Sequence, residues 1–198
     1  DKGQLEEAEE MFRRALAIDE AAHGPDHPKT GTTVNNLAGV LQKKGQLEEA
    51  EEMYRRALAI KEAAHGPDHP STGTTVDNLA GVLKDKGQLE EAEEMFRRAL
   101  AIKEAAHGPD HPSTGTTVNN LAGVLKKKGQ LEEAEEMYRR ALAIREAAHG
   151  PDHPSTGTTV NNLAGVLKKK GQLEEAEEMY RRALAIREAA HGPDHPST

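Results

Sequence analysis

The sequence predicts an all-α fold, a solenoid built from antiparallel helix hairpins, and three observations support this prediction. The chain has 198 residues and repeats itself every 42 positions, with few substitutions between copies. Within each copy, apolar residues recur at the spacing of one helix face. A Gly-Pro-Asp-His-Pro cluster interrupts the helical pattern once per copy. Because one repeat of this size cannot bury its apolar face alone, neighbouring repeats are expected to stack on each other.

The chain is expected to form a single repeat array over residues 1–198. Each complete unit contains a first helix, called helix A, and a second helix, called helix B, with a short link at a glycine between them. The array starts with a helix B over residues 3–23 and ends with a linker over residues 192–198. Between them we predict units with helices A and B over about residues 28–65, 70–107, 112–149 and 154–191.

Helix A is predicted from four apolar residues that share one face. In the unit that begins at Pro70, the residues Val76, Leu79, Ala80 and Leu83 have the spacing i, i+3, i+4, i+7. Such a face buries itself against a neighbouring helix, so these four residues are expected in the core.

The ends of helix A carry start and stop signals. Asp68 is expected to be the N-cap, with Pro70 in the first turn, where its missing N–H costs nothing. Ser71 is the alternative cap. Gly87 is expected to end the helix in the left-handed conformation that glycine adopts easily.

Helix B is predicted over about residues 88–106, where acidic residues in the first turn suit the positive end of the helix dipole. Its expected buried stripe, with Met95 and Ile102 at the edges, consists of Leu89, Ala92, Phe96, Ala99, Leu100 and Ala106.

Composition excludes several classes of protein. The formal net charge of −8 argues against a nucleic-acid or anionic-membrane partner. The chain contains no Cys, so it has no disulfide framework or thiolate metal site. No apolar run approaches the roughly 20 residues that span a bilayer. The absence of Cys and of a recognisable signal peptide favours a cytoplasmic location.

The histidine pairs and the Asp-His-Pro-Ser segment could suggest chemistry. His65 and His69 have the i, i+4 spacing of metal ligands on a helix, but a Gly-Pro turn lies between them. We therefore expect local hydrogen bonds or packing under the turn, with a pH-sensitive array as the alternative. Asp68, His69 and Ser71 contain the residue types of a hydrolase triad, but triads require converging segments. We expect no enzyme activity, no metal and no cofactor.

Charged and polar residues repeat along both helices. The pairs Glu93–Arg97 and Glu94–Arg98 are i, i+4 pairs that favour a solvated, convex face of helix B over a phosphate site. In helix A, Asn35 and Asn36 form a doublet in a position where Asn is a poor helix former. We expect the first Asn of each doublet to face a groove, and the second to bridge neighbouring hairpins.

The glycines at two positions of each helix A cost helix propensity, about 1 kcal/mol each relative to Ala. They are Gly31, Gly39 and their copies. Either a close approach of helices or an open groove floor is expected to compensate.

The unit resembles the tetratricopeptide repeat. The consensus pattern of that repeat is met here by Leu79, Ala80, Gly87, Ala92, Phe96 and Ala99, whereas Leu83 and Leu89 replace two of its aromatic residues. The usual period is 34 residues. The longer unit, with Asn-Asn-Leu-Ala in helix A and Gly-Pro-Asp-His-Pro between units, is similar to the repeats of kinesin light chain.

The resemblance implies a right-handed superhelix in which helices A line a concave groove that holds an extended peptide of a partner protein. Carried over residue by residue, the peptide groove consists of Thr74, Thr116, Asn35, Asp77, Asn119, Asn161, Lys84, Lys126 and Lys168. The kinesin heavy-chain-binding heptads are absent from residues 1–198, so the resemblance does not imply motor-cargo function.

We therefore expect a scaffold for protein–protein interaction that binds extended or repetitive peptide segments. One alternative is a structural module whose ends stack head to tail on other copies, because each end is expected to supply what the other lacks. Another is an engineered or recently duplicated array without a specific ligand.

Overall fold

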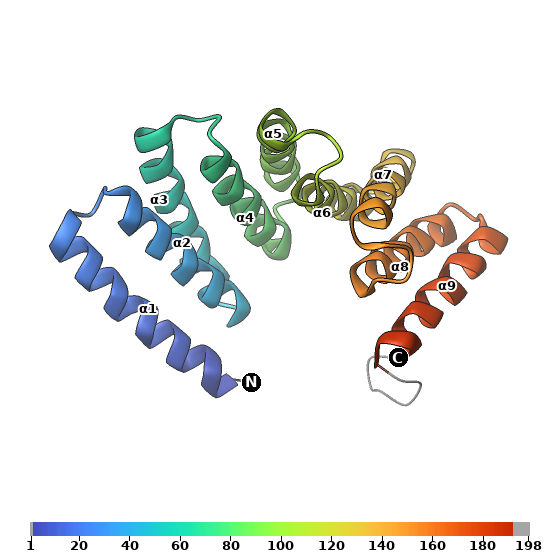
Figure 1. Ribbon diagram of the computed structural model, residues 1–198, viewed down its shortest axis with the longest axis horizontal. Coiled ribbons are helices and arrows are strands. Elements are labelled where there is room, and N and C mark those ends of the chain that lie inside the picture. Colours follow the sequence, from blue (N-terminus) through green and yellow to red (C-terminus); the bar gives the residue numbers. More distant parts are fainter. Residues whose placement is uncertain (1, 192–198) are drawn as a thin grey trace. The chain divides into compact units, whose positions relative to one another are not determined.

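The computed structural model describes residues 2–191, and over that range it contains nine α-helices and no strand (Figure 1). The all-α repeat fold is thereby confirmed, while the predicted linker over residues 192–198 lies outside the described residues. The chain divides into two compact units, Asp1–Ile102 and Lys103–Thr198, with the division inside α5. The helices are α1 Lys2–His23, α2 Pro28–Lys43, α3 Leu47–His65, α4 Pro70–Lys86, α5 Leu89–His107, α6 Pro112–Lys128, α7 Leu131–His149, α8 Pro154–Lys169 and α9 Leu173–His191.

In the first unit, α2 and α3 form an antiparallel hairpin, and the preceding helix α1 packs against α2. Helix α3 in turn packs against α4, and α2 contacts α4, so successive A helices lie side by side. The predicted face of α4 is confirmed, since Val76, Leu79, Ala80 and Leu83 are fully buried.

The second unit repeats this arrangement with the hairpins α6–α7 and α8–α9. Helix α7 packs against α8, and the A helices α6 and α8 contact each other. Its core contains the equivalent residues, among them Val118, Leu121 and Leu163, which are fully buried.

The buried stripe of helix B was predicted correctly at Ala92, Phe96 and Ala99. Leu89 and Leu100, also expected in the stripe, are only half-buried, and two further residues differ from the prediction. Ile102, expected at the edge, is only 4% exposed. Ala106, expected in the core, is exposed. The last turn of helix B extends beyond the start of helix A in the same hairpin, so the covered stripe ends near Ile102.

A close approach of helices A and B explains the first glycine position. A Cβ placed on Gly73 would lie 2.7 Å from Cγ2 and 3.1 Å from Cβ of Ile102. The same contact recurs in the other hairpins, at Gly31 with Ile60, Gly115 with Ile144 and Gly157 with Ile186. Any side chain at these positions would push the two helices of a hairpin apart.

The C-cap predicted for helix A is confirmed, but the predicted N-cap is wrong. Gly87 ends α4 with a φ of 81°, the left-handed conformation expected. The N-cap, however, is His69 and neither Asp68 nor Ser71: its imidazole accepts a hydrogen bond from the Ser71 N–H. The ring of His69 reaches the second N–H of the helix in the way that an Asn or Asp cap does.

Candidate functional site

Of the residues predicted to face a groove, Thr74, Thr116 and Lys168 are exposed, and the others are half-buried: Asn35, Asp77, Asn119, Asn161, Lys84 and Lys126. Thr74 and Thr116 are exposed, and each hydroxyl donates to the carbonyl four residues earlier, at Pro70 and Pro112, over 3.3 Å. Asp77 lies at the position of α4 that corresponds to Asn35 of α2, and it is half-buried. The threonines therefore offer hydroxyl oxygens to solvent, because their protons are bonded within the helix.

Hydrogen bonds link the asparagine row from one helix A to the next. In the first unit, Nδ2 of Asn78 donates to Oδ1 of Asn35 over 3.2 Å. In the second unit, the Thr159 hydroxyl lies 3.3 Å from Oδ1 of Asn119 and donates to it. The bridging role expected of the second Asn is thus observed at Asn78. Asn35 and Asn119 have their oxygens engaged, and their amide nitrogens remain able to donate to a ligand.

Helix B contributes side chains to this row that sequence reasoning missed. They occupy the position that directly follows the single Ile of each helix B. Nη1 of Arg145 donates to the Ser155 carbonyl over 2.6 Å and to the Thr159 hydroxyl over 2.7 Å, next to Asn119. Burial lowers the pKa of Arg145. This places a partly desolvated guanidinium beside the polar row of α6 and α8.

In the preceding repeats, the residue that follows the Ile of helix B also bonds to a threonine of helix A. Lys61 donates to the Thr32 hydroxyl over 3.2 Å, and burial lowers its pKa. Lys103 is buried and donates to the Thr117 hydroxyl over 2.8 Å. At the first copy of this position the charge is reversed, since Asp19 accepts from the Thr33 hydroxyl over 2.6 Å. A signal was available in the sequence, because this is one of the few positions that vary between repeats.

The last turn of helix A carries the predicted lysines. Lys84 lies 4.0 Å from the carboxylate of Asp85. Lys126 is partly buried, whereas Lys168 is exposed. At the corresponding place in α2, Gln42 donates to Asp85 over 2.7 Å and lies 3.4 Å from the Tyr54 hydroxyl, from which it accepts a hydrogen bond.

Tyrosine hydroxyls lie beneath the second glycine position. A Cβ on Gly39 would lie 3.3 Å from the Tyr54 hydroxyl, and one on Gly123 would lie 3.4 Å from that of Tyr138. Burial raises the pKa of both phenols to about 12. At Gly81 the nearest atom is Nε2 of Gln42, at 3.7 Å. This glycine row is therefore open enough for a methyl group at Gly81, in contrast to the row at Gly73.

The histidine pairs form stacked rings at each junction between units. His65 and His69 have ring centroids 4.8 Å apart. Nδ1 of His69 accepts from the backbone N–H of Ser71 over 3.2 Å, so the neutral ring carries its proton on Nε2. The local hydrogen bonding expected of these histidines is confirmed. In the described part of the chain, no three His, Asp or Glu side chains converge in a way that could hold a metal ion.

Salt bridges cover the opposite, exposed face of the B helices. Arg97 pairs with Glu93 over 2.8 Å, as the i, i+4 spacing predicts. Arg98 does not pair with Glu94 as expected, but reaches Glu62 of the preceding helix B over 2.6 Å and also donates to the Pro67 carbonyl. The second arginine of the doublet thus ties helix B to the preceding helix B, which a phosphate site would not require.

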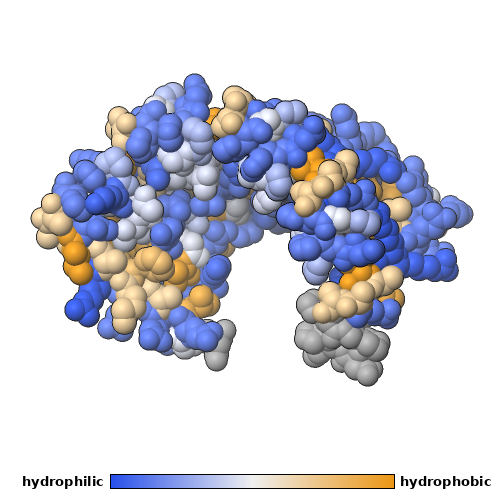
Figure 2. All heavy atoms as spheres, in the orientation of Figure 1, coloured by the Kyte–Doolittle hydropathy of each residue, from blue (hydrophilic) through white to orange (hydrophobic). Residues whose placement is uncertain are grey.

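Apolar side chains are exposed at both ends of the described chain. On α1, Ile18 is 59% exposed, whereas its counterpart Ile60 is 4% exposed. Figure 2 shows apolar surface over α1 and α2. On α9, Leu173 is 58% exposed and Tyr180 is 37% exposed, against 3% for the corresponding Tyr138.

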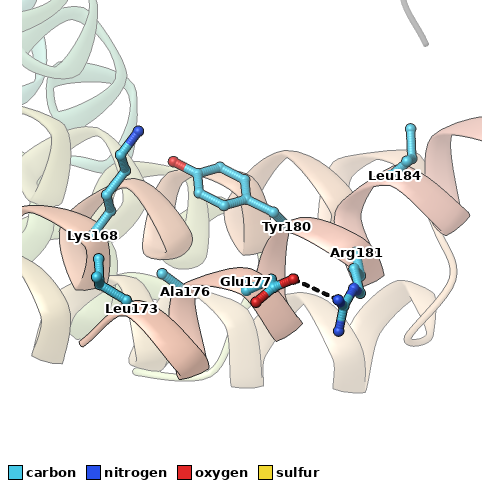
Figure 3. Close-up of a pocket in the computed structure, with 7 residues that line it drawn as sticks. All are labelled: Lys168, Leu173, Ala176, Glu177, Tyr180, Arg181 and Leu184. Carbon is cyan, nitrogen blue, oxygen red and sulfur yellow. Dashed lines mark hydrogen bonds and ion pairs between the residues drawn. The ribbon is translucent and has the colours of Figure 1, made fainter. Parts of the chain in front are cut away.

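A pocket of about 380 Å³ lies beside the exposed face of α9, and in Figure 3 the ring of Tyr180 extends from α9 toward Lys168. The pocket residues are Lys168, Leu173, Ala176, Glu177, Tyr180, Arg181 and Leu184. In the preceding hairpin, α8 covers the equivalent face of α7. None of the described helices is both long and apolar enough to cross a membrane.

A family model with the description Tetratricopeptide repeat matches residues 1–63, 32–105, 74–147, 113–189 and 155–198, which together extend over the whole chain. No curated protein sequence matches. Among solved structures, a Podosopora anserina putative kinesin light chain with nearly identical TPR-like repeats is similar at 29% identity and a TM-score of 0.78, over 96% of this chain and 90% of that one. A variant of it gives 28% and 0.80, over 96% and 89%.

A second similar structure is BtubC (BKLC) from P. vanneervenii. It has 27% identity and a TM-score of 0.84, over 98% of this chain and 77% of that chain. The resemblance to kinesin light chain repeats that the sequence indicated is therefore confirmed by independent structures.

Proposed function

The chain belongs to the tetratricopeptide repeat family, and from that premise we propose that it is a non-enzymatic scaffold that binds an extended or repetitive segment of a partner protein along the accessible row of its A helices. Proteins with this repeat fold generally serve in protein–protein interaction. The proposed ligand row consists of Thr74, Thr116, Asn35, Asp77, Asn119, Asn161, Lys84, Lys126 and Lys168.

The observation that carries the proposal is the hydrogen bonding of the asparagine row. Asn35 and Asn119 are each held by a side chain from the next helix A, Asn78 and Thr159 respectively. An amide that is fixed before binding loses little conformational entropy when it pairs with a peptide carbonyl. Extended peptides present such carbonyls at regular intervals, so a row of fixed amides suits them.

The near identity of the repeats determines the kind of ligand. Each unit presents almost the same contacts, so one short peptide can occupy several equivalent positions and the array alone selects no unique sequence. A ligand with repeated contacts gains affinity because later contacts are intramolecular. We therefore expect a repetitive or multivalent segment, bound through several weak contacts.

A peptide array with one, two and three tandem copies of each segment tests the proposal. Affinity for the best binder is expected to rise with copy number. Asn119→Ala should weaken binding, whereas Glu136→Ala, on the exposed face of helix B, should leave it unchanged. Tight binding that is independent of ligand copy number and insensitive to Asn119→Ala would refute the proposal.

End-to-end assembly is the second candidate function, and the exposed apolar end faces support it. The expected complementarity of the two ends stays a prediction. Both α1 and α9 are helices B, and in the interior of each unit the corresponding faces are covered by a helix A.

Sedimentation velocity over a range of protein concentrations tests this second candidate. Concentration-dependent sedimentation that is abolished by Leu173→Glu and unaffected by Glu136→Lys would support it. A sedimentation coefficient that stays constant up to high concentration would eliminate it.

A further inference from the structure

Two of the few substitutions in the repeat meet each other in space. Three of the four A helices carry Lys at the position of Gln42, and three of the four carry Lys at the position of Asp85. The two exceptions lie 43 residues apart, on α2 and α4 of the first unit, and their side chains form a 2.7 Å hydrogen bond. A chance pair of substitutions would seldom place complementary groups in contact.

At the first junction, between α2 and α4, the polar side chains therefore find their partners within the protein. Gln42 accepts from the Tyr54 hydroxyl, donates to Asp85 and lies over Gly81. Lys84 is 4.0 Å from the same carboxylate. The hydrogen-bonding groups of Gln42 and the charge of Asp85 are both matched within the protein.

The second junction, between α6 and α8, has different side chains at the corresponding positions. Lys126 takes the place of Gln42, and its Nζ lies 2.5 Å from where a Cβ of Gly165 would be, with the Tyr180 hydroxyl 3.6 Å from that same point. Lys169 takes the place of Asp85. Burial lowers the pKa of Lys126, and the charge of Lys169 lowers it further. Among residues 2–191, no acidic side chain pairs with Lys126 or Lys169.

We infer that the junction of Lys126 and Lys169 receives an acidic side chain of the bound segment, and that the pair Gln42–Asp85 excludes one, so that these substitutions set the register of the ligand. The inference rests on the proposed peptide-binding function. Identical repeats would allow the ligand to bind in several equivalent registers. The two junctions favour one register, because they differ in which ligand side chain they accept.

The chemistry of the two junctions supports opposite preferences. A carboxylate between Lys126 and Lys169 would form charge-assisted hydrogen bonds and relieve the repulsion between the two ammonium groups. The same carboxylate at the first junction would meet Asp85, and Gln42 has its amide already engaged. Discrimination of this kind combines an attractive site with a repulsive one.

A ligand-free measurement tests the premise. The double variant Lys126→Gln with Lys169→Asp installs the first junction's pair in the second unit, so its Tm is expected to rise by about 2–4 °C. The reciprocal variant, Gln42→Lys with Asp85→Lys, should lower the Tm. Every side chain introduced already occupies the equivalent position in another repeat, so folding is preserved. Equal Tm values for all three proteins would contradict the premise that repulsion between Lys126 and Lys169 lowers the stability of the chain.

A binding measurement tests the inference itself. Two fluorescein-labelled peptides are compared, identical except that Glu in one is Gln in the other, on the repetitive framework found by the array screen. The full chain is expected to prefer the Glu peptide roughly ten-fold. Lys126→Gln with Lys169→Asp should abolish that preference, and Gln42→Lys with Asp85→Lys should increase it.

The matched control for charge is Arg14→Asp with Lys29→Gln, two exposed residues of the first unit. It lowers the net charge as much as the second-unit variant does and should leave the preference unchanged. A preference that responds equally to both variants, or to neither, would overturn the inference while peptide binding itself persists. Failure of both peptides to bind would instead refute the proposed function.

Discussion

The two glycine positions of α4 make a paired prediction, because the structure assigns them opposite roles. At Gly81 an added methyl meets nothing closer than Nε2 of Gln42 at 3.7 Å, an ordinary contact. At Gly73 it would lie 2.7 Å from Cγ2 of Ile102. Gly81→Ala is therefore expected to stabilise the chain, and Gly73→Ala to destabilise it.

The magnitudes follow from helix propensity and packing. Ala in place of Gly in a helix interior gains about 1 kcal/mol, so Gly81→Ala should raise the free energy of unfolding by about that amount. Overpacking costs typically about 1–3 kcal/mol, which at Gly73 exceeds the smaller propensity gain near the helix start. The two variants should therefore differ by about 2–3 kcal/mol in the free energy of unfolding.

Urea unfolding followed by circular dichroism at 222 nm measures both variants. The double variant Gly73→Ala with Ile102→Ala identifies the cause, because removing the Ile102 side chain removes the atoms that the new methyl meets. Its cost should be lower than the sum of the single costs by about 1 kcal/mol. If Gly73→Ala were as stable as Gly81→Ala, the close approach of the helices would not be real.

One further prediction concerns pH, and another concerns the helix caps. Burial raises the pKa of Tyr54 and Tyr138 to about 12, above the ordinary value of about 10. Because the folded state holds these protons more tightly, their contribution to the free energy of unfolding is complete below pH 10 and falls as the pH rises toward 12. Tyr54→Phe with Tyr138→Phe should remove that part of the loss, which denaturant unfolding at each pH measures. At the start of α4, the His69 ring accepts the Ser71 N–H, so His69→Ala should lower the free energy of unfolding by about 0.5–2 kcal/mol, whereas His69→Asn, which keeps an acceptor, should cost less. Equal losses for the two variants in urea unfolding would show that the His cap is not the cause.

The helices and their buried faces were predictable because apolar spacing reports directly on burial. Val76, Leu79 and Leu83 needed only the helical period. The His69 cap was missed because capping preferences favour Asp and Ser, and the stack with His65 that orients the ring is not visible in a linear sequence.

The polar row was only partly predictable, because its members come from different helices. Arg145 directly follows a buried Ile near the end of helix B, where a cation is ordinarily solvated, yet it bonds to Thr159 on the next helix A. The pairing of Gln42 with Asp85 becomes apparent only when α2 and α4 are known to lie side by side. Such cross-repeat contacts depend on the stacking of hairpins, which periodicity indicates without giving the register.

The central claim, that the accessible row of the A helices is the ligand-binding surface, is tested most directly by site-specific photo-cross-linking. A benzophenone side chain is placed at Thr116 on α6, and in a control protein at Glu136 on the exposed face of α7, and each is irradiated with the best tandem peptide. Cross-linking at position 116 with little at 136 is predicted. Cross-linking at position 136 alone, or at neither while the peptide still binds, would contradict the claim.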